Sequence, residues 1–386
     1  MNTRKLRMAM IGGGKDAFIG AVHRLAFQMD GQIELVAGAL SVNPQLALES
    51  GRELFLSADR IYTDYKVMLE QEAIKPADQR IDFVSIVTPN FLHFEPAMLA
   101  MDHGFHVVVE KPITFTLEQA KQLREKMQST GKLLLLCHTY TGYPMVKQAR
   151  RLIQSGILGA IRKVYVEYPQ GWLSTYLEGT NHAQAAWRTD PKRSGKAGAM
   201  GDIGTHAFNM AEYVSGLHVT HICADVNTKV EGRLLDDDGA ALLKFNNGAS
   251  GVLMATQIAA GAENNIKVRV FGEKGGLEWQ QEDANSLLVK WPDQPAQIYR
   301  AGTGYADPFA KHNARTPAGH PEGYLEAFAN LYRNFAATLR ARMNGQEPTP
   351  EMLDFPSVEE GLRGMAFIEH VIASGKSEKK WIEFTV

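Results

Sequence analysis

The chain contains very little cysteine. Among its 386 residues only Cys137 and Cys223 are cysteines, and they lie far apart with no CxxC pair. A disulfide framework and a structural zinc site both need more cysteines at closer spacing, so the sequence argues against both. Free cysteines also fit a reducing compartment. We therefore expect a protein without disulfide bonds and without a bound metal.

The chain also lacks an excess of charge of either sign. It has 41 lysines and arginines against 43 aspartates and glutamates, and the two signs are interspersed. This balance argues against nucleic acid or a membrane surface as a partner. Residues 1–5 lead directly into a strand-like segment without an apolar leader, and no apolar run is long enough to span a bilayer. We expect a cytoplasmic protein that binds a small molecule.

The length of 386 residues indicates two domains. In the first third, apolar strands alternate with helical segments, a pattern typical of βαβ units and a parallel sheet. The expected strands cover residues 6–11, 33–40, 82–87, 107–112 and 133–137, and the expected helices cover 44–56, 64–72, 91–103 and 117–130. We expect a dinucleotide-binding Rossmann domain over 1–138 and a second domain for substrate binding and oligomerisation over 139–386, whose C-terminal helix could pack back on the first domain.

A glycine cluster follows the first expected strand. Gly12, Gly13 and Gly14 permit a tight turn in which backbone N–H groups can approach a pyrophosphate at a helix N-terminus. Gly12 and Gly14 fit the usual GxGxxG spacing, whereas the third glycine, Gly20, comes about three residues late. An ordinary turn between a strand and a helix is the alternative interpretation.

The end of the second expected strand carries no acidic residue. In NAD-binding sheets a carboxylate at this place accepts the ribose hydroxyls. Here the matching positions hold Leu40, Ser41 and Asn43. They offer neither a carboxylate to repel a 2′-phosphate nor an arginine to attract one, so the choice between NAD and NADP stays open.

The segment 107–112 places an ionisable pair at the end of a buried strand. Its three valines suit a strand covered on both faces, and Glu110, Lys111 and Pro112 follow at the edge where open α/β sheets bind ligands. Pro112 has no N–H and a fixed φ, so it ends the strand and holds the backbone of Lys111 in place. A strand end with a solvated lysine is the alternative.

The rest of the chain favours one large, mostly antiparallel sheet. Asn246-Asn247-Gly248 is a strong hairpin signal between two of its strands. The polar and aromatic segment 169–198 is long enough to be a binding loop. Strands are expected over 161–168, 221–230, 240–245, 249–258, 266–271, 277–281, 287–291, 296–300 and 381–386, and helices over 144–156, 202–215, 325–342 and 353–374. The fold class is therefore α/β followed by α+β.

Asp202 and His206 lie four residues apart in the helix expected over 202–215, so they should share one face. Asp202 could simply cap that helix, and His206 could be a buried core histidine. Near the start of a helix, the positive end of the dipole disfavours imidazolium, while Asp202 opposes that effect. The pair could thus poise the histidine to exchange a proton near neutral pH.

Taken together, these motifs resemble the Gfo/Idh/MocA family of NAD(P)-dependent oxidoreductases, which includes glucose-fructose oxidoreductase and inositol 2-dehydrogenase. The motifs occur in the right order along most of the chain. They are Gly12-Gly13-Gly14, Thr88-Pro89-Asn90 with His93, Gly104-x-His106-Val107, Glu110-Lys111-Pro112, Trp187-Arg188 and Gly201-Asp202-Ile203-Gly204-Thr205-His206.

The resemblance implies the site residues. It implies that Lys111, Asp202 and His206 are catalytic, with His206 as the base and Lys111 as a donor to the hydroxyl oxygen. The implied cofactor residues for NAD or NADP are Gly12, Gly13, Gly14, Phe18, Ile19, Ser41, Thr88, Pro89, Asn90, His93, Glu110, Lys111, Trp187 and Arg188. The implied substrate residues are Lys111, Tyr140, His182, Asp202, His206 and His320. The resemblance also implies a homodimer or homotetramer. For His320, a turn that leads into a helix is an equal alternative.

The aromatic and polar residues of segment 169–198 indicate a polyhydroxylated substrate, such as a sugar, glycoside or inositol. Arg188, Lys192, Arg193 and Lys196 could instead bind a sugar phosphate, which we weight less. Two other functions remain open by the same resemblance: an NAD-dependent glycoside hydrolase and a non-catalytic dinucleotide-sensing regulator.

Overall fold

The computed structural model describes residues 4–15, 17–180 and 182–386, so Asn181 of the predicted binding loop lies outside the described residues. Contacts divide the chain into two compact units. The first unit comprises Met1–Thr139 and Tyr324–Leu362, and the second comprises Tyr140–Gly323 and Arg363–Val386. The sequence analysis had assigned 324–362 to the second domain.

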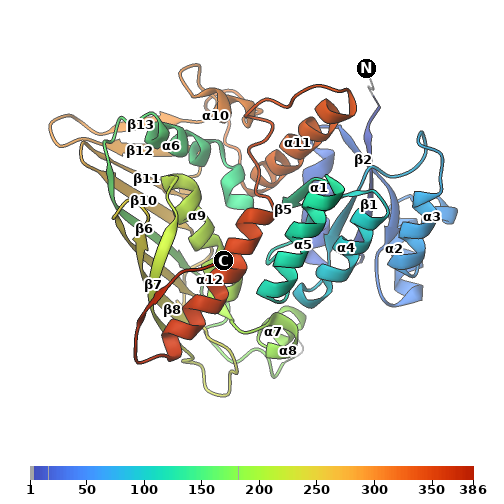
Figure 1. Cartoon of the computed structure of the whole chain (residues 1–386), viewed down its shortest axis with the longest axis horizontal. Coiled ribbons are helices and arrows are strands. Elements are labelled where there is room, and N and C mark those ends of the chain that lie inside the picture. The colour runs from blue at the N-terminus through green and yellow to red at the C-terminus, as the bar shows by residue number, and fades with distance from the viewer. Residues whose placement is uncertain (1–3, 16, 181) are drawn as a thin grey trace. The chain divides into compact units, whose positions relative to one another are not determined.

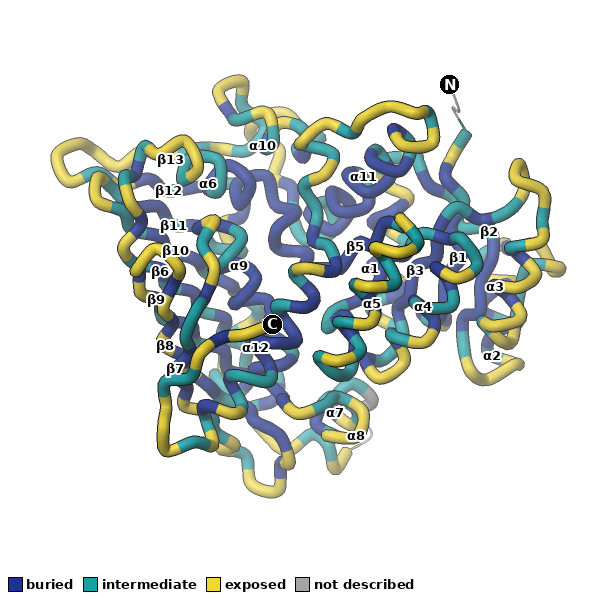
Figure 2. Tube along the Cα trace, viewed as in Figure 1, coloured by how far each residue is buried: buried dark blue, intermediate teal, exposed yellow. Residues whose placement is uncertain are grey.

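The first unit is built on a five-stranded parallel sheet with the order β2-β1-β3-β4-β5. Its strands are β1 (Leu6–Gly12), β2 (Ile33–Ala39), β3 (Phe83–Val87), β4 (His106–Val109) and β5 (Leu134–Leu136). All five residues of β3 are buried, as expected for the central strand of a sheet covered on both faces. Figure 2 shows these strands mostly in the buried colour.

The helices of the first unit connect these strands (Figure 1). They are α1 (Phe18–Gln28), α2 (Pro44–Glu53), η1 (Ala58–Arg60), α3 (Tyr65–Ala73), η2 (Asn90–Leu92), α4 (Phe94–Asp102) and α5 (Leu117–Thr130). A capping box formed by Thr116 and Gln119 starts α5, and Gly131 in the left-handed region ends it.

An isolated parallel bridge joins Gly38 of β2 to Ile61. If Ile61 is counted as a one-residue strand, the order becomes 3-2-1-4-5-6, the order of a Rossmann sheet. The sequence prediction had no strand there, because a single residue leaves no periodic signal. The strand order reverses between β1 and β3, which is where such sheets bind ligands.

A helix from late in the chain completes the core of the first unit. Helix α11 (Tyr324–Met343) contacts α1 and buries Phe328, Tyr332 and Phe335 in one hydrophobic cluster with β1, β3 and β5. The ring of Phe335 packs edge-on against Phe83, with centroids 5.2 Å apart. This packing explains why 324–362 belongs to the first unit although it follows the second unit in sequence.

The second unit is built on a nine-stranded sheet with the order β13-β12-β11-β10-β6-β9-β8-β7-β14. Only the β6–β9 pair is parallel among these neighbours. The strands are β6 (Ile161–Pro169), β7 (Val219–Asn227), β8 (Asp238–Phe245), β9 (Ser250–Thr256), β10 (Lys267–Gly272), β11 (Gly276–Gln280), β12 (Ser286–Lys290), β13 (Gln297–Arg300) and β14 (Trp381–Glu383). The predicted combination of a parallel sheet and a large, mostly antiparallel sheet is confirmed.

Helices α6 and α9 pack against this second sheet. The helices of the unit are η3 (Thr139–Gly142), α6 (Pro144–Gln154), α7 (Ala183–Arg188), α8 (Pro191–Ser194), η4 (Met200–Gly204), α9 (Thr205–Ser215), η5 (Gln281–Asp283) and α10 (Pro308–His312). Helix α12 (Val358–Lys376) has its first residues in the first unit and the remainder in the second. Of all the helices described, none is at once long enough and apolar enough to cross a membrane.

Three local predictions need correction. The segment 169–198 is not a continuous loop, because it contains α7 and α8. Helix α12 begins at Val358 rather than at 353, since residues 351–353 form turns and Pro356 precedes the helix. The segment 202–215 is not a plain α-helix, because its first residues belong to the π-helical turn η4. The predicted hairpin at Asn247-Gly248 is present, with Gly248 at φ +87°.

Candidate active site

The glycine cluster forms a tight turn at the end of β1. Gly12 and Gly13 have φ of +76° and +71°, which residues with a side chain rarely adopt. A Cβ on Gly20 would lie 2.4 Å from the Cα of Gly13, so only glycine permits this approach of α1 to the turn. Gly20 thus takes the close-packing role of the third glycine although it comes late in sequence.

Helix α1 begins directly after this turn. Its N-cap, Ala17, provides no side-chain hydrogen bond to the first turn, which contains the predicted cofactor residues Phe18 and Ile19. A helix start that no side chain caps leaves its N–H groups for an anion. The glycine turn and the N-terminus of α1 together fit the pyrophosphate of a dinucleotide.

The edge of the sheet beyond β2 is neutral. Ser41 accepts a hydrogen bond from the backbone N–H of Asn43 at 3.1 Å, and Asn43 caps α2 by accepting from Leu46 at 3.2 Å. The position where a ribose-binding carboxylate often lies therefore offers a hydroxyl and an amide.

The loop after β3 lies beside the glycine turn. A Cβ on Gly12 would lie 2.9 Å from Cγ2 of Thr88, so the structure brings these two predicted cofactor residues together. Pro89 and Asn90 start the short helix η2, and the side chain of Asn90 is buried.

His93 lies at the end of this loop, and both of its ring nitrogens contact backbone carbonyl oxygens. Its Nε2 lies 2.8 Å from the carbonyl oxygen of Thr88, and its Nδ1 lies 2.7 Å from that of Pro112. Burial lowers the pKa of His93, against the opposing effect of the two carbonyls. Both ring nitrogens thus contact backbone, and His93 joins the loop after β3 to the residue that follows Lys111.

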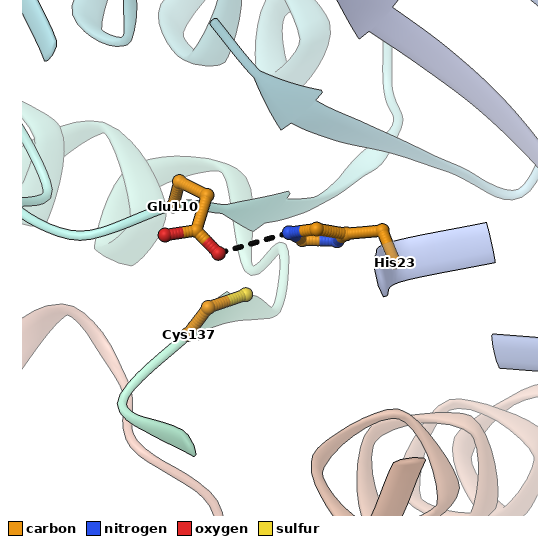
Figure 3. A group of neighbouring side chains, drawn as sticks. All are labelled: His23, Glu110 and Cys137. Atoms are coloured by element: carbon orange, nitrogen blue, oxygen red, sulfur yellow. Dashed lines mark hydrogen bonds and ion pairs between the residues drawn. The ribbon is translucent and has the colours of Figure 1, made fainter. Parts of the chain in front are cut away.

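Glu110 and Lys111 come directly after β4, at the same edge of the sheet. The Glu110 carboxylate accepts the backbone N–H of Lys111 on Oε2 at 3.1 Å and contacts Nε2 of His23 through Oε1 at 2.9 Å. Figure 3 shows this oxygen directed at the His23 ring. Burial alone would raise the pKa of Glu110, but the hydrogen bond from His23 and the nearby positive charge of Lys111 bring it below its usual value. Glu110 is therefore a buried carboxylate.

Cys137 lies next to this pair, and the three side chains offer metal-ligating atoms within 4.8 Å of one another (Figure 3). Burial and the charge of Glu110 raise the pKa of the Cys137 thiol well above its usual value. A thiol held in its protonated form is a poor metal ligand, and His23 and Glu110 already bond to each other. The arrangement therefore favours a hydrogen-bonded pair of His23 and Glu110, with Cys137 packed beside it.

A second buried histidine follows β5 at the same edge. His138 is 3 % exposed, and burial together with the nearby positive charge of Lys111 lowers its pKa to about 3. It is therefore neutral at physiological pH. The sequence analysis did not single out His138, because its position one residue after a short strand carries no motif.

In the second unit, the approach to His206 is a π-helical turn, η4 (Met200–Gly204). The Asp236 carboxylate accepts the backbone N–H groups of Gly198 and Met200 at 2.6 and 2.7 Å and so fixes the start of the turn. A Cβ on Gly198 would lie 2.1 Å from the carbonyl oxygen of Asp236, which excludes other residues there. Such π-helical turns often occur at functional sites.

Because of this turn, the helical run begins before Asp202, and His206 is not in its first turn. The positive end of the helix dipole therefore acts only weakly on His206. The carboxylate of Asp202 instead accepts two side-chain hydrogen bonds, from Arg188 at 2.8 Å and from Gln257 at 3.0 Å. Arg188 also stacks on the ring of Trp187, 4.6 Å from its centroid.

His206 is buried against two tyrosines. The ring of Tyr140 lies edge-on to His206 with centroids 5.0 Å apart, and the ring of Tyr168 lies at 6.3 Å. The two tyrosine hydroxyls are joined by a hydrogen bond, and Tyr168 donates to the Asn264 amide oxygen at 2.7 Å. Burial raises the pKa of Tyr140, so its hydroxyl group stays protonated.

Neutral amides extend this network. Gln170 donates to Asn264 at 2.5 Å, and Gln257 donates to Gln170 at 3.3 Å as well as to Asp202. Tyr168 and Gln170 flank the end of β6, and Gln257 follows the end of β9, its parallel neighbour. The sequence analysis missed Tyr168, Gln170, Gln257 and Asn264, because it did not predict that these two strands are parallel neighbours.

Two predicted substrate residues are exposed. His182 caps α7 by accepting from the backbone N–H of Ala185 at 3.2 Å, and its ring lies 5.8 Å from that of Trp172. His320 lies in a turn in which its carbonyl accepts from the Thr316 hydroxyl at 2.8 Å. Their roles towards a substrate, and those of Trp187 and Arg188 towards a cofactor, stay predictions.

Residues 6–138 match the profile of an oxidoreductase family with an NAD-binding Rossmann fold, and residues 146–278 match the GFO/IDH/MocA C-terminal domain. An oxidoreductase of Bacillus subtilis, YfiI, is 30 % identical over 99 % of this chain and 98 % of its own length. The chain belongs to the GFO/IDH/MocA family. As a member of this family, it is an oxidoreductase with an NAD-binding domain.

Other members of the family carry more specific names. The crystal structure of an inositol dehydrogenase homolog from Azotobacter vinelandii, complexed with NAD⁺, is 35 % identical with a TM-score of 0.93 and covers 99 % of this chain and 98 % of its own. A crystal structure of an inositol dehydrogenase homolog from the same organism, complexed with NADH and myo-inositol, is 33 % identical with a TM-score of 0.90 and covers 99 % of this chain and 98 % of its own. Levoglucosan dehydrogenase of Pseudarthrobacter phenanthrenivorans is 26 % identical over 98 % of both chains.

Proposed function

We propose that this enzyme uses NAD to oxidise a secondary hydroxyl of an unphosphorylated sugar, glycoside or inositol. The observation that supports this substrate class is the neutral network around His206. Hydroxyl groups of Tyr140 and Tyr168 and the amides that follow them can exchange hydrogen bonds with several hydroxyls of a polyol. The names of the inositol and levoglucosan dehydrogenases in the family favour the same class.

The charges of segment 169–198 favour a neutral substrate. Arg188 is paired with Asp202 at 2.8 Å, and Lys196 is paired with Glu369 at 2.5 Å. These two carboxylates already partner the cations that a sugar phosphate would need. A phosphorylated substrate would have to replace both ion pairs or use Lys192 and Arg193 alone.

The proposed chemistry divides between the two units. A bound NAD supplies the hydride acceptor. His206 accepts the proton of the substrate hydroxyl, and the Lys111 ammonium donates to the same oxygen as negative charge develops on it. Asp202, held by Arg188 and Gln257, is the third catalytic residue of this proposal and helps to orient the groups around His206. Loss of Lys111 or His206 should lower turnover by on the order of 10²-fold or more.

A panel of inositols, pyranoses, glycosides and sugar phosphates, each offered with NAD and with NADP, tests the proposal. We expect reduction of NAD, followed by absorbance, with at least one unphosphorylated polyol and loss of that activity in His206→Asn. The neutral edge at Ser41 leaves NADP as an outcome to be measured. Release of free sugar without net reduction would indicate the glycoside hydrolase instead. Tight NADH binding without turnover of any compound would indicate the regulator.

A further inference from the structure

A chain of buried polar side chains runs from α11 through α1 to Lys111. Ser85 and Tyr332 are joined at 2.9 Å, Tyr332 and Nδ1 of His23 at 2.6 Å, and Nε2 of His23 and Glu110 at 2.9 Å. Each of these four residues is at most 8 % exposed. The chain ends where Glu110 accepts the backbone N–H of Lys111.

The hydrogen bonds of this chain have one consistent direction. The buried Glu110 carboxylate is only an acceptor, so Nε2 of His23 carries the proton that it donates. In a ring that carries its proton on Nε2, Nδ1 is an acceptor, and the Tyr332 hydroxyl donates to it. Ser85 donates to Tyr332 in turn. Each group between Ser85 and Glu110 thus accepts one hydrogen bond and donates the next.

We propose that Glu110, held by His23, is a positioning residue that fixes the backbone of Lys111 relative to α1. Helix α1 begins at the glycine turn that fits the dinucleotide, so one carboxylate places both the cofactor helix and the lysine. On the far side of Lys111, His93 holds the carbonyl oxygen of Pro112. This inference rests on the proposed role of Lys111.

The expected effect follows from the geometry of catalysis. A shift of a reacting group by about 1 Å can lower a rate by on the order of 10²-fold. In Glu110→Ala, the Lys111 N–H and the His23 ring both lose their acceptor, so we expect turnover per folded site to fall by about that factor. A role limited to stability would lower the amount of folded protein and leave turnover per site unchanged.

Glu110→Gln separates hydrogen bonding from charge. The glutamine oxygen can still accept from Lys111, while its NH₂ group can donate to Nε2 of His23 if the ring moves its proton to Nδ1. Tyr332 would then accept from His23 and donate to Ser85, so the whole chain would reverse without losing a hydrogen bond. We expect Glu110→Gln to retain turnover within about tenfold of the original protein.

Cys137→Ala is the matched control, because Cys137 lies in the same buried group outside the hydrogen-bonded chain. Turnover of each variant is measured with the best substrate of the panel at saturating NAD. The number of folded sites is taken from NADH fluorescence titration. The inference would be supported if turnover per folded site falls in Glu110→Ala and is retained in both Glu110→Gln and Cys137→Ala. Equal turnover per site in Glu110→Ala and the original protein, or equal losses in both Glu110 variants, would overturn it.

Nitrogen chemical shifts of selectively labelled histidine give a readout that needs no substrate. His23 should carry its proton on Nε2 in the original protein and on Nδ1 in Glu110→Gln. A proton on Nδ1 in the original protein would overturn the inference, even if Glu110→Ala failed to fold. Lys111→Ala distinguishes a failure of the proposed function from a failure of the positioning role alone. Near-normal turnover in that variant would reject the proposed function, whereas its loss beside an unaffected Glu110→Ala would reject only the positioning role.

Discussion

Tyr140 connects the polar network of the second unit to His206. Its ring contacts the imidazole edge-on, while its hydroxyl reaches Tyr168 and Asn264. In the proposed function, this hydroxyl binds a substrate oxygen beside His206. The sequence analysis named Tyr140 through the family resemblance alone, and the structure gives its position a physical reason within the second unit.

Tyr140→Phe should lower kcat/KM by roughly tenfold, because about one hydrogen bond to a neutral group is lost while the ring packing remains. NADH affinity should stay unchanged, since the hydroxyl belongs to the substrate network. Steady-state kinetics and fluorescence titration measure the two quantities. Tyr165→Phe, in the middle of β6, is the control. An unchanged kcat/KM in Tyr140→Phe would remove Tyr140 from the substrate site.

His106, a partly buried residue at the start of β4, affects the stability of the first unit. Its Nδ1 accepts the backbone N–H of Leu133 at 2.8 Å, so the neutral form fits the structure. Burial and the positive charges of Lys132 and Arg342 lower its pKa to about 4, from 6.5. Between these two values the unfolded chain binds the extra proton, so acidification favours unfolding.

Acidification from pH 6.5 to 5.0 should therefore cost between about 1 and 2 kcal/mol of stability through His106 alone. Denaturant unfolding of the original protein and of His106→Gln at several pH values measures this term. The amide oxygen of glutamine can still accept from Leu133 but does not titrate. The variant should lose less stability per pH unit, by about 1.4 kcal/mol. Parallel pH profiles for the two proteins would contradict the assignment.

At the scale of elements, one buried arginine, Arg233, contacts several residues of the segment 169–198 and so holds its first part in place. Arg233 donates to the carbonyls of Leu173 and Thr175 at 2.9 and 3.0 Å and pairs with Glu178 at 2.7 Å and Asp237 at 3.2 Å. Its guanidinium thereby ties the first part of the segment to the end of the loop before β8. This function was not visible in the sequence, where Arg233 is one of many charged residues between two strands.

Arg233→Met should destabilise the second unit by about 3 to 5 kcal/mol, because it leaves buried carboxylates without their partner. The same change should expose segment 169–198 to limited proteolysis, mapped by mass spectrometry. Arg162→Met is the matched control, since its ion pair with Glu273 is exposed and should contribute at most about 1 kcal/mol. Similar stability losses in both variants would show that Arg233 does not hold the segment.

At the scale of the whole molecule, one face of the nine-stranded sheet is incompletely covered. The strand registers place Leu242 of β8 beside Val252, Val252 beside Tyr165, and Leu288 beside Ile298. Leu242 is 47 % exposed and Ile298 is 55 % exposed. This row is apolar at its two ends, with Arg269 and Glu278 between Tyr165 and Leu288. Partly exposed apolar residues on one sheet face often mark a protein interface. This face fits the homodimer or homotetramer that the family resemblance predicts.

Leu242→Arg should therefore reduce the mass of the particle in solution, measured by light scattering during size-exclusion chromatography. A buried unpaired charge opposes association through this face. Ile74→Arg is the control, because Ile74 is 77 % exposed at the end of α3 in the first unit. A monomeric original protein, or an unchanged mass for Leu242→Arg, would contradict the predicted use of this face.

The sequence by itself determined the two sheets and the motifs at their edges. Strand and helix periodicity is local, so the alternation in the first third and the row of strands after 219 could be read directly. The glycine cluster, the Glu110-Lys111 pair and the Asp202–His206 spacing are likewise local patterns. They were sufficient to indicate a dinucleotide fold and the oxidoreductase family.

Only the tertiary structure decided which distant residues meet. The return of α11 to the first unit places Tyr332 against His23, more than 300 residues earlier, and the parallel pairing of β6 with β9 places Gln257 beside Gln170. The π-helical turn before His206 depends on Asp236 from another loop. Such contacts arise from burial of apolar surface and pairing of buried polar groups across the chain, which no local periodicity encodes.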